Sequence, residues 1–380
     1  MTQLRLTLEQ VFPELAQSLE PARRERLAGV IDRFFNETLT FTNDGLPFVI
    51  TGDIPAMWLR DSTWQVAPFL HSDHSAVAEL LTDLSLAQMK YFLIDPYANA
   101  FNPTPSGNCW HQDFVDQSPW VFERKFELDS WASLLFLARK IKERWGITRH
   151  LGDQFAEVLR VMIDLARKEQ RHDRDGYRFF RTNGVPHDSL SHDGLGAPVA
   201  YTGMIYSAFR PSDDACVYGY LIPANLFFLN ELKALDPAQL PDDLIHEIET
   251  GISEYGISDL GFAYEVDGLG NQLFIDDANI PSLLSLPFLE VCTPNDSIYL
   301  TTRKRLLSSE NPYFYTGEFG SGIGSPHTPV GYIWPIAIAI QALTDLSAAA
   351  IPDAIALLET TDAGTGKMHE SFNPNDPTQF

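Results

Sequence analysis

Apolar residues at helical spacing recur along most of this chain, whereas the alternating pattern of β-strands is short and rare. Leu27, Ile31 and Phe34, for example, form one stripe of a segment that is otherwise rich in charge. Strand-like pieces such as 47–50 and 177–181 are expected to decorate loops. The periodicity predicts an all-α protein with helices over residues 23–38, 76–92, 128–145, 155–168, 213–235, 245–255, 296–308, 330–346 and 352–359.

The predicted helices recur in consecutive pairs, separated by long polar loops that contain glycine and proline. Neither a sequence repeat of fixed short period nor a low-complexity linker divides the chain. We therefore expect a single domain over residues 1–380, in which the helix pairs form a toroid and the apolar segment 333–343 is an inner helix. The loops at one end of such a toroid converge on a central pocket, so the polar and aromatic loops should carry the chemistry.

The charge balance limits the partners of the protein. Lys and Arg total 27 against 51 Asp and Glu, a formal net charge of −24, which speaks against nucleic acid and against anionic membranes. Arg5 and Glu9 interrupt the place where a signal peptide would be apolar, and the apolar window 332–343 is too short for a membrane span. The 3 cysteines are widely spaced, so neither a disulfide framework nor a metal clip is predicted. We expect a cytoplasmic protein.

Residues 51–62 combine an aromatic ring, a cation and a carboxylate in one short loop, as Trp58, Arg60 and Asp61. The helix that follows is predicted to begin near Asp61 or Ser62, and either side chain could cap it. The alternative is a sugar site, in which Arg60 and Asp61 bind hydroxyl groups and Trp58 packs against the apolar face of the ring. The residue types alone leave both interpretations open.

A second charged and aromatic stretch spans 120–129, where Glu123 and Arg124 stand among large aromatic residues. One interpretation is the solvated start of a helix, but Glu123 and Glu127 would then be like charges one turn apart. This poor charge pairing favours a partly buried role beside a site.

Asp213 and Asp214 are adjacent carboxylates within the stretch 207–220. Ser212 or Asp213 is predicted to cap the long apolar helix that follows. Two adjacent carboxylates exceed what capping needs, so one of them is available to point across a pocket.

Two stretches near the C-terminal end carry further candidates. The glycine-rich segment 317–329 follows no apolar strand, which argues against a dinucleotide site. It is interpreted as a loop that brings His327 near a ligand, and the alternative is an ordinary hydrogen-bonded loop histidine. Glu370 lies in the segment 368–372, and the zinc-peptidase spacing HExxH occurs nowhere in the sequence.

Taken together, these stretches resemble glycoside hydrolase family 125, the metal-independent exo-α-1,6-mannosidases. The similar segments follow one another from about residue 48 to the end of the sequence, and it is their number and order that make the resemblance specific. They are TGDIPAMWLRDS, YANAFN, VFERKFELDS, DGYRFFR, AFRPSDDACVYGYLIPAN, DDANIPSLLSLPFL, YLTTRKRLLSSENPYFY, GIGSPHTPVGYIWPIAIAIQALT and MHESFNPNDP.

The resemblance implies an (α/α)6 barrel, which agrees with the toroid of helix pairs. It also implies an inverting mechanism with two carboxyl groups and neither a metal nor another cofactor. By motif the general acid is Asp213 or Asp214, and the general base is Glu370. Asp214 is favoured as the acid because Asp213 is better placed to cap the predicted helix. Room for the attacking water implies carboxyl groups roughly 6.5–9.5 Å apart.

The same resemblance implies that the substrate is a mannose-containing oligosaccharide, such as an N-glycan, from which non-reducing-end α-1,6-linked mannose is removed. By motif position, Arg60 and Asp61 are expected to bind hydroxyl groups of the terminal mannose. The full set of expected substrate-binding residues is Trp58, Arg60, Asp61, Glu123, Arg124, Arg210 and His327.

One departure from the family concerns the C-terminal end. In the family an aromatic-rich helix follows the HESF…NDP stretch and completes the barrel, whereas this sequence ends at Phe380, so that helix is expected to be missing here. The alternatives are therefore a mannoside-binding protein without catalysis, a barrel glycosidase of other specificity and a metal-requiring α-mannosidase.

Overall fold

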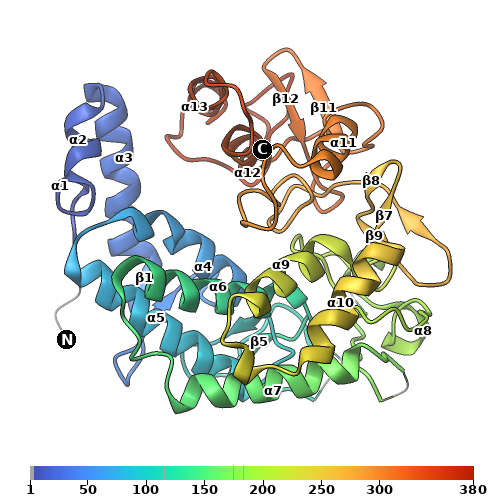
Figure 1. Cartoon of the computed structure of the whole chain (residues 1–380). Helices are drawn as coiled ribbons and strands as arrows, with labels where there is room; N and C mark the ends of the chain where they lie inside the picture. The colour runs from blue at the N-terminus through green and yellow to red at the C-terminus, as the bar shows by residue number, and fades with distance from the viewer. Residues whose placement is uncertain (1–3, 114–115, 174, 183) are drawn as a thin grey trace. The chain divides into compact units, whose positions relative to one another are not determined.

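The structure is a computed structural model that describes residues 4–113, 116–173, 175–182 and 184–380. The chain divides into two compact units, Met1–Ala166 and Arg167–Phe380, which are described separately below. Figure 1 follows their helices and strands along the chain. None of the helices in the described residues is both long enough and apolar enough to cross a membrane.

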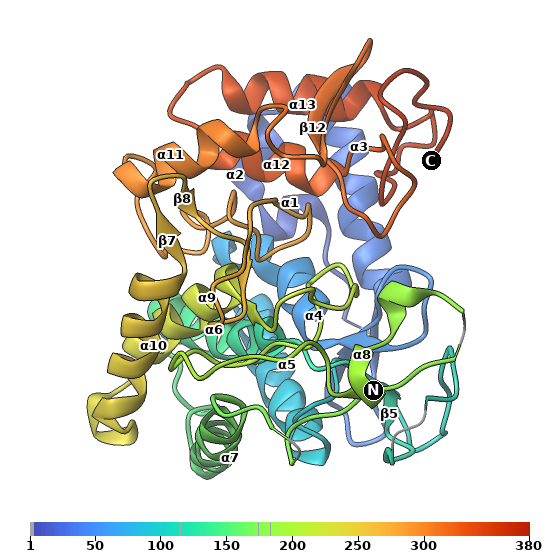
Figure 2. The same ribbon diagram turned by 90° about the vertical axis from the view of Figure 1, so that its right-hand side faces the viewer.

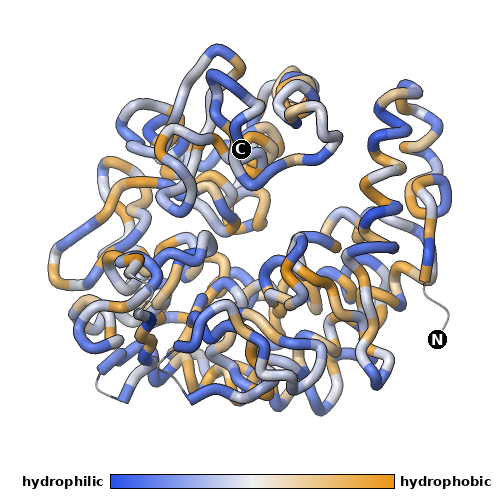
Figure 3. Tube along the Cα trace, turned by 180° about the vertical axis from the view of Figure 1, so that it is seen from behind, coloured by the Kyte–Doolittle hydropathy of each residue, from blue (hydrophilic) through white to orange (hydrophobic). Residues whose placement is uncertain are grey.

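The first unit is mainly helical, with a few short strands. Along helix α3 (Pro21–Arg33) hydrophobic and hydrophilic positions are interspersed (Figure 3), and Ile31 is its buried residue. The unit contains α1 (Leu8–Val11), α2 (Pro13–Ser18), α3, the π-helical turn η1 (Phe34–Thr38), β1 (Leu39–Phe41), β2 (Pro47–Val49), β3 (Met57–Trp58), α4 (Leu59–Val66), the 3₁₀ helix η2 (Ala67–His71), α5 (Ser75–Ile94), β4 (Ala100–Phe101), β5 (Val121–Glu123), α6 (Leu128–Trp145) and most of α7 (Asp153–Glu169).

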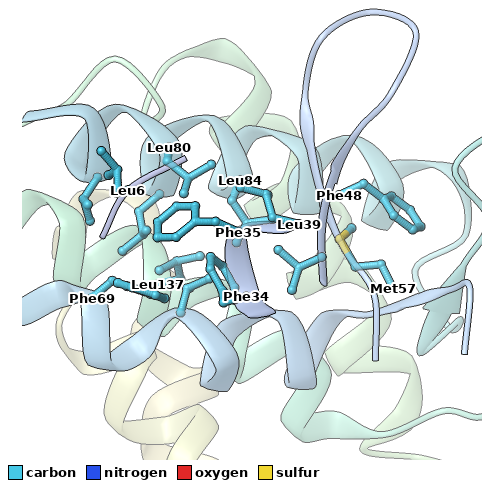
Figure 4. Close-up of a cluster of buried hydrophobic side chains, with 14 of the residues drawn as sticks. Leu6, Phe34, Phe35, Leu39, Phe48, Met57, Phe69, Leu80, Leu84 and Leu137 are labelled. Carbon is cyan, nitrogen blue, oxygen red and sulfur yellow. The ribbon is translucent and has the colours of Figure 1, made fainter. Parts of the chain in front are cut away.

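A cluster of aromatic and aliphatic side chains forms the core of this unit. The rings of Phe34 and Phe69 have centroids 4.7 Å apart, and Phe35 meets both of these rings edge-on. Leu84 of α5 and Leu137 of α6 pack into the same cluster, where the labelled side chains point toward one another (Figure 4). Burying each such side chain contributes about 1.5–3 kcal/mol, so this core fixes α5 against α6.

A small antiparallel sheet in the first unit holds two predicted site residues on its outer strands. Trp58 of β3 pairs with Ala100 of β4, and Ala100 pairs in turn with Glu123 of β5. The sheet therefore brings together two segments that are far apart in the sequence.

The second unit joins short sheets to helices. Figure 2 shows α12 and α13 side by side near the C-terminus. The elements are η3 (Pro186–Asp188), α8 (Ser191–Gly194), β6 (Tyr220–Leu221), α9 (Ile222–Lys233), η4 (Pro237–Gln239), α10 (Asp242–Tyr255), β7 (Ile257–Ser258), β8 (Gly261–Phe262), β9 (Glu265–Val266), β10 (Gln272–Leu273), α11 (Ser297–Leu306), β11 (Phe314–Gly317), β12 (Gly320–Ile323), α12 (Pro335–Leu343) and α13 (Ala350–Thr360).

The segment after α13 is anchored by backbone pairing. Phe372 and Ile333 exchange two N–H to carbonyl hydrogen bonds of 2.9 Å each. Phe372 is fully buried and packs with Ile333 and Ile338. A buried, paired residue two positions beyond Glu370 holds the segment that carries this glutamate.

Most predicted helices are confirmed, and α6 has the predicted bounds, but three expectations are wrong at their N-terminal ends. The helix predicted over 213–235 begins only at Ile222, the one predicted from 330 begins at Pro335, and α4 begins at Leu59 with Trp58 as its N-cap. Asp61 and Ser62 therefore lie inside α4 and do not cap it. The strand-like piece 47–50 is β2, whereas residues 177–181 form no strand.

Local geometry explains the late start of α9. Asp213 has a φ of 70°, in the left-handed region that a right-handed helix excludes. Phe209 and Ala215 form an isolated antiparallel bridge around it. Gly219 lies against Tyr206 so closely that a Cβ atom there would be 2.1 Å from the ring. Residues 209–219 therefore form a tight loop and not a helical turn.

Candidate functional site

The loop 210–218, which carries the adjacent aspartates, is closed by backbone hydrogen bonds. The amide of Arg210 donates to the carbonyl of Asp214 over 2.8 Å, and the amide of Asp213 donates to the carbonyl of Arg210 over 2.9 Å. Asp214 is 1% exposed, whereas Asp213 is only half-buried. Aspartate is one of the few residues that tolerate the left-handed backbone of Asp213, and such strained residues cluster at functional sites.

A buried glutamate holds both ends of this loop. Nε of Arg210 donates to one carboxylate oxygen of Glu265 over 2.6 Å, and the amides of Val217 and Tyr218 donate to the other oxygen over 2.8 Å each. Arg210 is 4% exposed and Glu265 is fully buried. Arg210, predicted to bind substrate, is thus paired with Glu265 at the first position of the loop.

Two histidines surround the carboxylate of Asp214. Nδ1 of His327 lies 3.0 Å from Oδ1 of Asp214, and Nε2 of His187 lies 3.9 Å from the same oxygen. Burial lowers the pKa of His327, but the hydrogen bond to Asp214 and the charges of Asp213, Asp214 and Glu370 outweigh it and raise the pKa to about 9. His327 is therefore protonated at neutral pH, and its Nδ1 donates to Asp214.

Glu370 belongs to the same electrostatic cluster, because its charge is among those that raise the pKa of His327. Its side chain is exposed, and the segment that carries it is anchored by Phe372. The structure thus brings together Asp213, Asp214, His327 and Glu370 within the second unit. Sequence reasoning missed His187, which stands in a polar stretch without any distinctive pattern.

In the first unit, Arg60 is buried among carboxylates. It is 3% exposed and forms ion pairs with Glu127, with Asp129 at 3.3 Å and with Asp61 at 3.3 Å. Burial raises the pKa of Asp129 to about 6, although the neighbouring Arg60 cation opposes the rise. Of the three carboxylates that pair with Arg60, that of Asp61 is the most exposed, at 26%.

Glu123 is connected to this cluster through an amide. Nδ2 of Asn99 donates to Glu123 over 3.0 Å and to Glu127 over 3.2 Å. Nζ of the buried Lys125 lies 3.8 Å from Glu123. Most of the stretch 120–129 is therefore buried, with Trp120 and Arg124 partly exposed, and its poor charge pairing had indicated a partly buried stretch.

Two other predicted binding residues have different surroundings. Nε of Arg124 donates to Asp95 over 2.6 Å, and its guanidinium lies over the ring of Tyr97 at 5.3 Å. Trp58 is 4% exposed and meets Phe122 edge-on, with centroids 5.6 Å apart. Its indole Nε1 is buried and has no hydrogen-bond acceptor among the residues that the structure describes.

The cluster around Asp214 and the cluster around Arg60 both consist of acids, bases and hydrogen-bond donors. In the part of the chain that the structure describes, no three His, Cys, Asp or Glu side chains gather as ligands for a metal ion. A carboxylate beside a protonated histidine, with a further carboxylate nearby, can exchange protons with a bound substrate and with water.

Comparison with known proteins gives consistent results over nearly the whole chain. A sequence model of the family described as metal-independent alpha-mannosidase (GH125) matches residues 20–380. The meiotically up-regulated gene 157 protein of Schizosaccharomyces pombe is 37% identical over 421 residues, which cover 98% of this chain and 82% of that protein.

Solved structures agree with this match. A Streptococcus pneumoniae structure, described as belonging to a family of metal-independent alpha mannosidases and as a non-productive complex with alpha-1,6-mannobiose, is 40% identical. It superposes with a TM-score of 0.92 and covers 98% of this chain and 92% of its own. A structure named Glycosidase Wild Type, 14% identical with a TM-score of 0.51 over 94% of this chain and 91% of its own, shares the fold alone. The chain therefore belongs to the metal-independent α-mannosidases of glycoside hydrolase family 125 and is a glycoside hydrolase.

Proposed function

We propose that the protein is an inverting exo-α-1,6-mannosidase with an (α/α)6 barrel. It would remove non-reducing-end α-1,6-linked mannose from oligosaccharides such as N-glycans. The observation that carries the proposal is the cluster in the second unit, where the Asp214–His327 pair and Glu370 interact electrostatically. The 40% identical Streptococcus pneumoniae protein was solved with alpha-1,6-mannobiose, which supports the linkage.

Inversion requires one carboxyl group to protonate the leaving oxygen and another to deprotonate the attacking water. We propose Asp214 as the acid, with Asp213 as the alternative, and Glu370 as the base. The preference no longer rests on helix capping, because no helix begins at Asp213. It rests on position, because the carboxyl group of Asp214 is buried and its Oδ1 lies 3.0 Å from Nδ1 of His327, a second group that can exchange protons. The exposed side chain of Glu370 is accessible to water, as a base requires.

The residues of the first unit would supply hydroxyl recognition. Asp61 is the most exposed partner of Arg60, so its carboxylate is the group of this cluster best able to accept from a sugar hydroxyl. The indole Nε1 of Trp58 has no acceptor among the described residues and could donate to a sugar hydroxyl, and Arg60, Glu123 and Arg124 are proposed as further substrate-binding residues. Within the second unit, His327 and Arg210 are proposed as substrate-binding residues, and Arg210 also holds one end of the loop 210–218 through Glu265.

The test is incubation of the protein with α-1,6-, α-1,3- and α-1,2-mannobiose while NMR follows the anomer released. Release of β-mannose from the α-1,6 substrate alone would support the proposal, and initial release of α-mannose would overturn inversion. Saturable binding of the α-1,6 substrate without hydrolysis would favour a mannoside-binding protein. Loss of activity with a chelator, restored by calcium or zinc, would favour a metal-requiring enzyme.

A further inference from the structure

Asn99 is a fully buried residue of the first unit to which the proposed function gives no part. It directly precedes β4, and Nδ2 of its side chain donates to Oε2 of Glu123 over 3.0 Å and to Oε1 of Glu127 over 3.2 Å. Its Oδ1 accepts the backbone amide of Lys125 over 3.1 Å. Both the donor and the acceptor of this side-chain amide are therefore engaged within the protein, and Asn99 has no exposed surface with which to contact a sugar.

Glu127 connects Asn99 to Arg60. Oε2 of Glu127, its second carboxylate oxygen, accepts from Nη1 of Arg60 and from the hydroxyl of Ser130, the latter over 3.1 Å. Arg60 and Glu123 are therefore the two ends of one chain of hydrogen bonds, in which Glu127 and Asn99 are the inner members. Both ends are proposed substrate-binding residues, whereas the inner members are not.

The main chain of Asn99 is held independently of its side chain. Its carbonyl accepts the amide of Leu59, the first residue of α4, over 3.0 Å. Leu59 directly precedes Arg60, and the residue after Asn99, Ala100, pairs with Glu123 across the small sheet. A substitution of the Asn99 side chain therefore removes its hydrogen bonds to the two carboxylates and leaves these backbone contacts in place.

Two buried carboxylates that accept from the same amide depend on that amide for their orientation. Like charges repel more strongly where water is excluded, and a shared charge-assisted hydrogen bond offsets part of the repulsion. We infer that Asn99 is a positioning residue, which holds Glu123 directly, and Arg60 through Glu127, in the orientation that binds the sugar. The inference rests on the proposed function, which assigns Glu123 and Arg60 to the substrate.

The first test needs no substrate, because it compares crystal structures of the wild type, Asn99→Ala and Asn99→Asp. Asn99→Asp keeps the size of the side chain but presents a carboxylate where the two glutamates need a donor. We expect the carboxylates of Glu123 and Glu127 to move by more than about 1 Å in both variants, a displacement large enough to affect turnover. Unchanged positions in Asn99→Ala would overturn the inference, and this variant decides alone if Asn99→Asp does not fold.

The matched control is the same pair of substitutions at Asn102. Asn102 is also fully buried and lies directly after β4, but its Nδ2 bonds to backbone carbonyls instead of carboxylates. The carbonyls are those of Asn108, Pro119 and Val121, at 3.0, 3.3 and 3.3 Å. Asn102→Ala is expected to lower stability and to leave the carboxylates of Glu123 and Glu127 in place. If it displaced them as far as Asn99→Ala does, general loosening of the sheet would explain the result, and a specific role for Asn99 would be refuted.

The second test uses turnover of α-1,6-mannobiose. We expect KM to rise about tenfold in Asn99→Ala, because the hydroxyl-binding groups lose their orientation, while kcat changes by less than about threefold. Asn102→Ala should change KM by less than about twofold. An unchanged KM in Asn99→Ala, with or without a lower kcat, would overturn the inference, as would an equal rise in Asn102→Ala. Should the wild type lack activity, the proposed function fails, whereas the crystal structures still decide whether Asn99 orients the carboxylates.

Discussion

His327 donates from Nδ1 to Oδ1 of Asp214 across 3.0 Å and so joins two loops that are distant in the sequence. The pair is partly shielded, since the carboxylate is almost fully buried and the imidazole is 30% exposed. In such surroundings a charged hydrogen bond contributes more than it would at the surface. The pair therefore links the stability of the second unit to its proposed acid chemistry.

His327→Gln should reduce stability in a pH-dependent way. The pKa of His327 is about 9 in the folded chain and 6.5 for an unperturbed histidine, so the stabilisation is fully present below pH 6.5 and is lost as the pH rises through 9. The difference in unfolding free energy between wild type and variant should be largest near pH 6, at most about 3 kcal/mol. Urea unfolding at several pH values measures it.

The comparison for this prediction is His187→Gln. Its Nε2 is 3.9 Å from Asp214, beyond hydrogen-bond distance, and its side chain is 46% exposed. Its substitution should change the unfolding free energy much less than His327→Gln does. A His327→Gln difference that stays constant from pH 6 to about 10 would contradict the raised pKa.

Asp214→Asn and Glu370→Gln should each remove turnover while leaving the fold intact. Each keeps the shape of the side chain but cannot exchange the proton that acid or base catalysis needs, so kcat should fall by about 10²–10⁴-fold or more. Turnover of α-1,6-mannobiose and circular dichroism together check this. Asp213→Asn is the companion variant: if it is inactive while Asp214→Asn is active, the acid is Asp213.

The sequence allowed prediction of the helices because their apolar stripes persist over several turns. Helix α6 combines buried Leu, Phe and Ala positions with a charged last turn and a glycine cap at Gly146 in the left-handed conformation. Family motifs then identified Asp213, Asp214, His327 and Glu370, which the structure brings together. Signals of this kind are local, so they can be recognised from the amino-acid sequence alone.

The supports of the site were not predictable, because their partners are distant in the sequence. Glu265 holds Arg210, and Asp277 holds Ser212, over separations of 55 and 65 residues. No periodicity or short motif records such pairings. The same limit explains why the predicted start of α9 was wrong. Aspartate is a common helix cap, and only contacts within the loop hold Asp213 in the left-handed region.

Glu265→Gln should destabilise the protein strongly. In the variant, an NH2 group replaces one carboxylate oxygen, and this donor would face either the Arg210 side chain or the backbone amides of Val217 and Tyr218. The Arg210 cation would also lose its buried anionic partner. Breaking a buried ion pair costs about 3–5 kcal/mol. Urea unfolding should show a loss of that order, together with reduced turnover because the loop 210–218 loses its anchor.

The surface variant Asp73→Asn is the control for Glu265→Gln. It also removes a carboxylate that pairs with an arginine, Arg144, but the side chain of Asp73 is 91% exposed. Exposed pairs contribute about 0–1 kcal/mol, so the loss should be small. Equal effects of the two substitutions would mean that Glu265 does not act as a buried anchor.

Arg60→Met should destabilise the first unit more at pH 8 than at pH 5. Removal of the cation leaves Glu127 and Asp129 buried without it, and the pKa of Asp129, already raised to about 6 by burial, should rise further. A carboxyl group with a raised folded pKa stabilises the fold below its unfolded value near 4, and that contribution is lost as the pH rises through the folded value. Thermal unfolding from pH 5 to 8 measures the trend. The control is Arg24→Met, which removes an exposed arginine paired with Glu9 and should show no such pH dependence. If the loss of stability in Arg60→Met did not vary with pH, the buried carboxylates would not depend on Arg60.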